Sequence, residues 1–149
     1  MLPTVTTYLN GLITFPAVAT VPILYVEDDA LTRQTIAGRL RRRGHTIIEA
    51  TSGEEALQLV TTLPRPCVAL LDIDLPGVDG LETYRKLLEM FPLLPAVVCS
   101  ATLTDGRRSS FHKLGIPEER LLPKPCPFER ILAAIDSVLP RDSHNGHAS

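Results

Sequence analysis

Short apolar runs alternate along the chain with longer segments in which apolar residues recur every third or fourth position. The apolar runs predict five strands, at residues 23–26, 45–50, 68–71, 96–99 and 121–124. The amphipathic segments predict five helices, at residues 30–43, 53–63, 81–91, 104–114 and 127–139. Short connections join each strand to the helix that follows it. This alternation predicts an α/β fold with a five-stranded parallel sheet and helices on both faces.

The order of the strands follows from handedness. Right-handed crossovers with one reversal of winding give the flavodoxin-like, doubly wound (βα)5 order 2-1-3-4-5. The reversal then lies between the first and third strands, and ligands of open α/β sheets bind beyond the carboxyl ends of the strands. We therefore expect the chemistry where residues 23–26 and 68–71 end.

Charged and hydroxyl side chains stand at these strand ends. Glu27 and Asp28 follow the first strand, Asp72 follows the third, Ser100 ends the fourth and Lys124 ends the fifth. Clustered carboxylates repel one another by several kcal/mol per pair at ~4 Å, and a hard divalent cation such as Mg²⁺ relieves that repulsion. Each residue alone also has a structural explanation, as a turn starter, a loop hydroxyl or a surface charge.

Composition narrows the class of protein. The 149 residues suffice for one domain, and a net charge of −2 offers no basic excess for nucleic acid. The three cysteines lack metal-site spacing, so we interpret them as reduced and mostly buried, in a cytoplasmic protein.

The two ends of the chain fall outside the predicted domain, residues 22–140. Residues 1–21 are apolar but contain no Lys or Arg and are broken by Pro and Gly, so they fit neither a secretory signal nor a membrane span. We expect a loosely ordered extension, with a docking strand or an upstream start codon as alternatives. Residues 141–149 are polar and predict a disordered tail.

The motifs ILYVEDD, LLDIDLPGVDG, CSA and KP, taken together, resemble the receiver domain of two-component response regulators over about residues 22–140. The resemblance implies that Asp72 accepts a phosphoryl group from a phosphohistidine of a histidine kinase or histidine phosphotransfer protein. It also implies Mg²⁺ as cofactor and a cis Lys124-Pro125 bond. The implied ligands and switch residues are the side chains of Asp28 and Asp72, the backbone of Asp74, Glu27 through water, the switch hydroxyl of Ser100 and the phosphoryl-pairing Lys124.

The chain departs from the family pattern in two places. Leu121 stands where such domains carry a switch aromatic, and residues 115–124 are about two residues longer than usual. The signal is therefore expected to leave the site by another route than an aromatic rotamer. Asp74 and Thr102 occupy positions that tune hydrolysis of the acyl phosphate in similar domains, with a sign that the sequence leaves open.

We therefore expect a phosphoacceptor signalling domain without its own output domain, a monomer or weak homodimer that catalyses only its own phosphorylation and dephosphorylation. By resemblance, an unknown downstream protein docks on the face formed by helix 4, strand 5 and helix 5. One alternative is a receiver-like interaction module that never carries phosphate. A less favoured alternative is a phosphatase of the haloacid dehalogenase type, whose DxD motif Asp72-Ile73-Asp74 matches.

Overall fold

The computed structural model describes residues 7–9, 12–14, 21–63, 67–75, 77 and 79–139. Its main sheet has five strands, and all neighbouring strands in it run parallel. Across the sheet the strands are β4 (Ile47–Ala50), β3 (Ile23–Val26), β5 (Val68–Asp72), β6 (Ala96–Ser100) and β7 (Leu121–Pro123). This is the order 2-1-3-4-5, so the predicted flavodoxin-like fold is confirmed.

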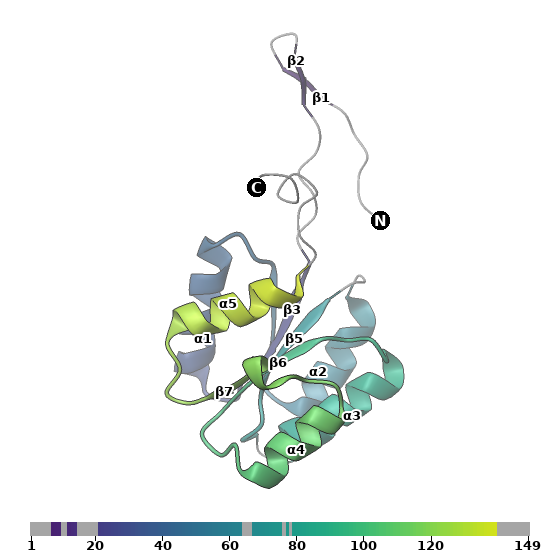
Figure 1. The fold of residues 1–149 in the computed structure, drawn as a ribbon. Helices are drawn as coiled ribbons and strands as arrows, with labels where there is room; N and C mark the ends of the chain where they lie inside the picture. Colours follow the sequence, from purple (N-terminus) through teal and green to yellow (C-terminus); the bar gives the residue numbers. More distant parts are fainter. Residues whose placement is uncertain are drawn as a thin grey trace.

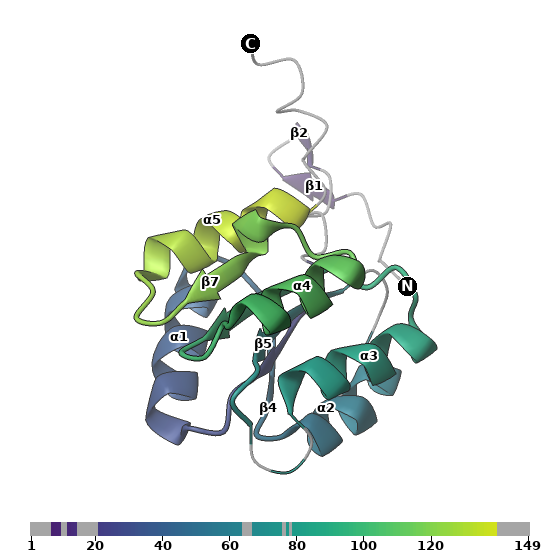
Figure 2. The same cartoon turned by 60° about the horizontal axis from the view of Figure 1, so that its bottom comes forward.

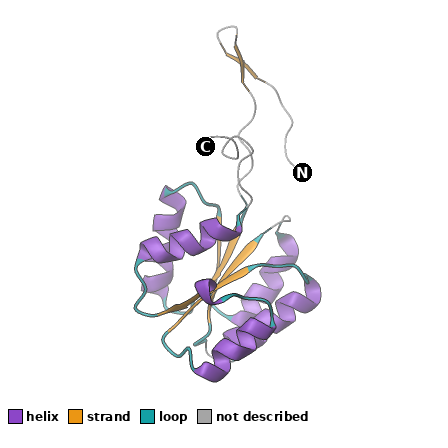
Figure 3. Cartoon of the chain, in the orientation of Figure 1, coloured by secondary structure: helices purple, strands orange, loops and turns teal. Residues whose placement is uncertain are grey.

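Helices cover both faces of this sheet (Figures 1 and 2). On one face lie α1 (Ala30–Arg42) and α5 (Phe128–Val138). On the other lie α2 (Gly53–Leu59), α3 (Gly80–Met90) and α4 (Asp105–Lys113). Figure 3 shows the sheet between these two helical layers, and the short 3-10 helices η1 (Val60–Thr62) and η2 (Glu118–Arg120) complete the main fold.

The core consists of two apolar clusters, one on each side of the sheet. Leu24, Leu71 and Val98 point to the side of α2, α3 and α4, while Ile23 and Leu70 point to the side of α1 and α5. All five residues of β5 and of β6 are buried, as expected of strands covered on both faces. Burial of each large apolar side chain stabilises the fold by about 1.5–3 kcal/mol, so the central strands form a rigid base for the residues at their ends.

Side chains cap the helices that begin near the carboxyl ends of the strands. Asp29 accepts a hydrogen bond from the Thr32 amide at 2.8 Å and so begins α1. Thr104 begins α4 in the same way, by accepting from the Arg107 amide at 3.2 Å. Each such cap stabilises its helix by about 1 kcal/mol.

Some predictions concern segments outside the described residues. Of the predicted extension, only β1 (Thr7–Leu9), β2 (Leu12–Thr14) and residue 21 are described, and the two strands form an antiparallel pair in a sheet of their own. The predicted tail, residues 141–149, lies outside the described part altogether, so the predicted domain boundaries stay predictions. Within the described residues, no helix is long and apolar enough to cross a membrane.

Candidate functional site

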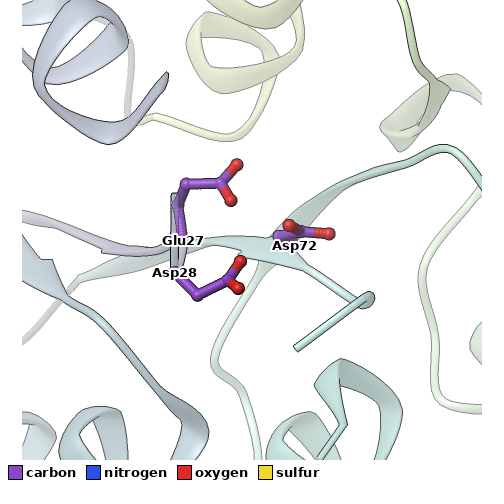
Figure 4. Close-up of side chains that lie close together, drawn as sticks. All are labelled: Glu27, Asp28 and Asp72. Carbon is purple, nitrogen blue, oxygen red and sulfur yellow. The ribbon is translucent and has the colours of Figure 1, made fainter. Parts of the chain in front are cut away.

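Three carboxylates meet where β3 and β5 end. Glu27 and Asp28 directly follow β3, and Asp72 is the last residue of its parallel neighbour β5. One oxygen of each carboxylate lies within 4.8 Å of the others. Figure 4 shows the three side chains side by side at the ends of the two strands. Glu27 and Asp72 are buried, whereas Asp28 is exposed. Clustered oxygen ligands of this kind, with one side open to water, suit Mg²⁺.

Lys124 supplies the positive charge of this cluster. Its Nζ donates to Glu27 Oε1 at 3.1 Å and to Asp72 Oδ2 at 3.3 Å. The backbone places it there, because the Lys124 amide donates to the Ser100 carbonyl at 2.8 Å just beyond β7. Burial alone would lower the pKa of Lys124, but the charges of Asp72 and Glu27 outweigh it and raise that pKa above its ordinary value. The Lys124-Pro125 bond is cis, as the sequence motif implied.

Glu27 is the carboxylate with the most perturbed ionisation. Burial, followed by the hydrogen bond and charge of neighbouring Asp72, raises the pKa of Glu27 to about 7. The ammonium of Lys124 opposes this rise without cancelling it. Without a further cation the site therefore tends to retain a proton on Glu27 near neutral pH.

The loop after β5 holds Asp72 in place. Asp72 Oδ1 accepts a hydrogen bond from the Asp74 amide at 2.9 Å. Gly77 has a φ of 73°, the left-handed conformation that glycine adopts without strain. At the start of α3, a Cβ on Gly80 would lie 2.4 Å from the Ile73 Cα. Glycine at this position lets α3 pack directly on the backbone that carries Asp72.

The side chain of Asp74 joins a second cluster, on the loop after β6. Its Oδ2 accepts from the Ser100 hydroxyl at 2.9 Å and from the Ala101 amide at 3.1 Å. Its Oδ1 accepts from the Thr102 hydroxyl and lies 3.4 Å from Arg107 Nη1. Burial alone would raise the pKa of Asp74, but the hydrogen bonds from Thr102 and Ser100 lower it below its ordinary value.

Sequence reasoning named Ser100, Asp74 and Thr102 but missed Arg107. The only signal was its position, in the first turn of the helix that follows Ser100. Leu121, the position expected to lack an aromatic, is fully buried at the start of β7 and packs in the core on the side of α4.

A cavity of about 520 Å³ opens beside the carboxylates. Asp72, Glu27, Lys124 and Ala101 line one part of it, and residues of β3, β5, β6, α1, α5 and the segment after β7 line the rest. The structure therefore brings the predicted residues Glu27, Asp28, Asp72 and Lys124 to one place. Asp74 links this cluster to the other two predicted residues, Ser100 and Thr102, because its amide donates to Asp72 and its side chain accepts from both hydroxyls. The roles of all these residues stay predictions.

Comparison with known proteins identifies similar sequences. Residues 23–136 match the family profile described as the response regulator receiver domain. The response regulator MprA of Mycolicibacterium vanbaalenii is 34% identical over 121 residues, which is 81% of this chain and 51% of that protein. MprA of Mycobacterium leprae is 34% identical over 119 residues, 80% of this chain and 51% of that protein. The chain thus spans about half the length of the curated relatives it matches.

Solved structures share the fold. A response regulator receiver protein from Pseudomonas putida superposes with a TM-score of 0.75 at 22% identity, covering 81% of this chain and 99% of that one. A chain of the CheX-CheY-BeF3-Mg complex from Borrelia burgdorferi superposes with a TM-score of 0.72 at 22% identity, covering 79% of this chain and 88% of that one.

Proposed function

Since the chain belongs to the family of response regulator receiver domains, we propose that Asp72 is its phosphoacceptor. The observation that carries the proposal is the position of the Lys124 ammonium between Asp72 and Glu27, with Asp28 beside them. A buried carboxylate with a cation on one side and an open cavity on the other is suited to gain a phosphoryl group.

The proposed reaction is a transfer between two side chains. A carboxylate oxygen of Asp72 attacks the phosphorus of a phosphohistidine on a sensor kinase or phosphotransfer protein. The new O–P bond forms as the P–N bond breaks, and the electron pair of that bond leaves with the imidazole. Lys124 already touches Asp72 and neutralises charge that accumulates on the phosphoryl oxygens. Once the phosphoryl group is on Asp72, the Ser100 hydroxyl donates a hydrogen bond to the same oxygens.

We propose that the carboxylate cluster binds Mg²⁺. The side chains of Asp28 and Asp72 and the backbone carbonyl of Asp74 would hold it, with Glu27 acting through water. Bound Mg²⁺ supplies positive charge that offsets the three carboxylates and the phosphoryl oxygens. Glu27 must release its proton as the ion binds, because its raised pKa belongs to the metal-free arrangement.

The partners of the site are also proposals. A histidine kinase or histidine phosphotransfer protein would donate the phosphoryl group. A downstream protein would recognise the phosphorylated state on the face formed by α4, β7 and α5. Function without an output domain, a cytoplasmic location and a monomeric or weakly dimeric state stay predictions from the sequence.

The test is labelling with a small radioactive phosphodonor, acetyl phosphate, in the presence of Mg²⁺. We expect acid-stable but base-labile label on the wild-type protein and none on Asp72→Asn. Asp136→Asn, which removes an exposed carboxylate from α5, should be labelled like wild type. Equal labelling of Asp72→Asn would contradict the assignment. Sustained release of phosphate from a phosphate monoester, beyond one equivalent, would instead support the phosphatase alternative.

A further inference from the structure

The Asp74 carboxylate accepts hydrogen bonds from four donors that are distant from it in the sequence. Although it lies two residues after Asp72, its four donors come from the end of β6, the loop that follows it and α4. Three of them are the Ser100 hydroxyl, the Ala101 amide and the Thr102 hydroxyl. The fourth is the guanidinium of Arg107. We call Asp74, Ser100, Thr102 and Arg107 the clasp.

The clasp occupies the one proton that Ser100 can donate. A hydroxyl has a single donor, and here it points to Asp74 Oδ2 at 2.9 Å. The same oxygen of Ser100 accepts from the Thr102 amide at 2.9 Å, and Ser100 is completely buried, so water cannot replace these partners. Ser100 therefore cannot donate to a phosphoryl group on Asp72 while it donates to Asp74.

Arg107 connects the clasp to helix α4. Its Nη1 lies 3.4 Å from Asp74 Oδ1, donates to the Thr102 carbonyl at 3.3 Å and contacts the Thr102 hydroxyl. Its own amide donates to the Thr104 side chain that caps α4. A movement of Asp74 or Thr102 must therefore change the contacts of the first turn of this helix.

We propose that Asp74 and Arg107 are positioning residues that couple the phosphoacceptor site to helix α4. The coupling has two states. In the unphosphorylated protein Asp74 keeps the Ser100 hydroxyl away from Asp72, and Arg107 fixes the first turn of α4 to Asp74. When Ser100 donates to the phosphoryl group, Asp74 loses a donor and the clasp with Arg107 opens. The inference rests on the proposed phosphoacceptor function, and it gives the signal a route to α4.

The first test measures the affinity for beryllofluoride with Mg²⁺ by calorimetry. The two states compete for one hydroxyl, so removal of the Asp74 carboxylate should favour the ligand-bound state. We expect Asp74→Ala to bind about fivefold or more tightly than wild type. Loss of a negative charge alone could produce part of that gain. The same substitution in a Ser100→Ala background separates the two causes, because a gain through Ser100 disappears there and a charge effect persists.

The second test follows the amide resonances of residues 105–110 in ¹H–¹⁵N spectra as beryllofluoride is added. In wild type these α4 resonances should shift together with those of the site. In Arg107→Ala the site resonances should still shift while those of α4 no longer respond, and Arg107→Lys should restore part of the response.

Arg108→Ala is the matched control for this second test. Arg108 lies on the same helix but pairs with Glu118 at 2.9 Å, so its removal should leave the α4 response intact. An unchanged α4 response in Arg107→Ala, or a gain in affinity of Asp74→Ala that is undiminished without Ser100, would overturn the inference. Failure of the proposed function is distinct, because wild type itself would then neither bind beryllofluoride nor be labelled.

Discussion

At the scale of single residues, the ionisation of Glu27 determines the charge of the metal-free site. Its side chain is buried beside Asp72 and in contact with Lys124, so one ammonium serves two carboxylates. Burial and the neighbouring carboxylate raise the pKa of Glu27 to about 7, from an ordinary value of 4.5. A proton bound to Glu27 is thus part of the most stable metal-free state.

This ionisation predicts how the stability of the metal-free protein depends on pH. The folded state binds the Glu27 proton more tightly than the unfolded state does. The stabilisation is therefore complete below about pH 4.5 and is lost as the pH rises through about 7. As the pH rises across this window, we expect loss of the Glu27 proton to lower the free energy of unfolding by roughly 2 to 3 kcal/mol. Urea unfolding in a chelating buffer at several pH values measures it.

Glu27→Gln is the control, because glutamine keeps the shape but cannot ionise. Other groups titrate in the same window, so the difference between the two profiles isolates Glu27. The wild-type curve should fall relative to that of Glu27→Gln as the pH rises. Parallel curves would show that Glu27 is ionised throughout and that Lys124 alone compensates the pair.

The residues of the site differ in how far the sequence could predict them. Asp72 ends a strand of the parallel sheet, and Glu27 and Lys124 directly follow the ends of two others, so topology alone brings them together. The contacts of Asp74 depend on a side-chain rotation after a turn, and those of Arg107 on the direction in which α4 leaves the loop. Neither quantity has a periodic signal in the sequence. The clasp could therefore be found only from coordinates.

At the scale of elements, the alternation of apolar runs and amphipathic segments predicted every β-strand and α-helix of the main fold but not the 3-10 helix η2. The ends of the elements were less certain. The predicted helix 53–63 is α2 up to Leu59, followed by η1, since an amphipathic pattern does not distinguish α from 3-10 geometry. On α3 Leu87 is fully buried, while Leu88 beside it is partly buried against the same core cluster. Both lie on the inner side of one turn.

The contact between α3 and the loop of Asp72 gives a prediction for Gly80. Alanine there would place a Cβ 2.4 Å from the Ile73 Cα and 2.6 Å from the Asp72 carbonyl oxygen. Backbone atoms must move to accept it, so we expect the free energy of unfolding to fall by about 1–3 kcal/mol. Phosphorylation of Asp72 should also slow, because the displaced segment carries the acceptor. Urea unfolding and the rate of labelling measure the two effects.

Gly38→Ala is the matched control within another helix. Gly38 lies inside α1, where an added Cβ would meet nothing within 4 Å. Removal of an interior glycine should then raise the free energy of unfolding by about 0.5–1 kcal/mol and leave labelling unchanged. Equal effects of the two substitutions would mean that the close approach of α3 to Ile73 does not constrain the site.

At the scale of the whole molecule, the reversal of winding explains why the charges converge. The chain proceeds from β3 to the edge strand β4 and then returns to β5 on the other side of β3. The strands that carry Glu27 and Asp72 therefore lie side by side although 45 residues separate these two carboxylates, from position 27 to position 72. A cluster assembled in this way exists only in the folded protein, so any ion that binds it also stabilises the fold.

This linkage predicts a response to Mg²⁺ of the whole domain. At a concentration about a hundredfold above its dissociation constant, the ion should raise the free energy of unfolding by about 2.7 kcal/mol. That corresponds to an increase of roughly 5 to 10 °C in the melting temperature of a domain of this size. The response should be measured near pH 8, where Glu27 has lost the proton that competes with the ion. Asp28→Ala should remove most of it.

The exposure of Asp28 makes that substitution a selective one. Because its side chain lies at the surface, we expect the free energy of unfolding of the metal-free Asp28→Ala protein to lie within about 0.5 kcal/mol of the wild-type value. Asp105→Ala, which removes an exposed carboxylate at the start of α4, should keep the full response to Mg²⁺. If Asp28→Ala were stabilised as strongly as wild type, the ion would bind elsewhere. If wild type showed no response, a receiver-like module without phosphoryl chemistry would explain the site better.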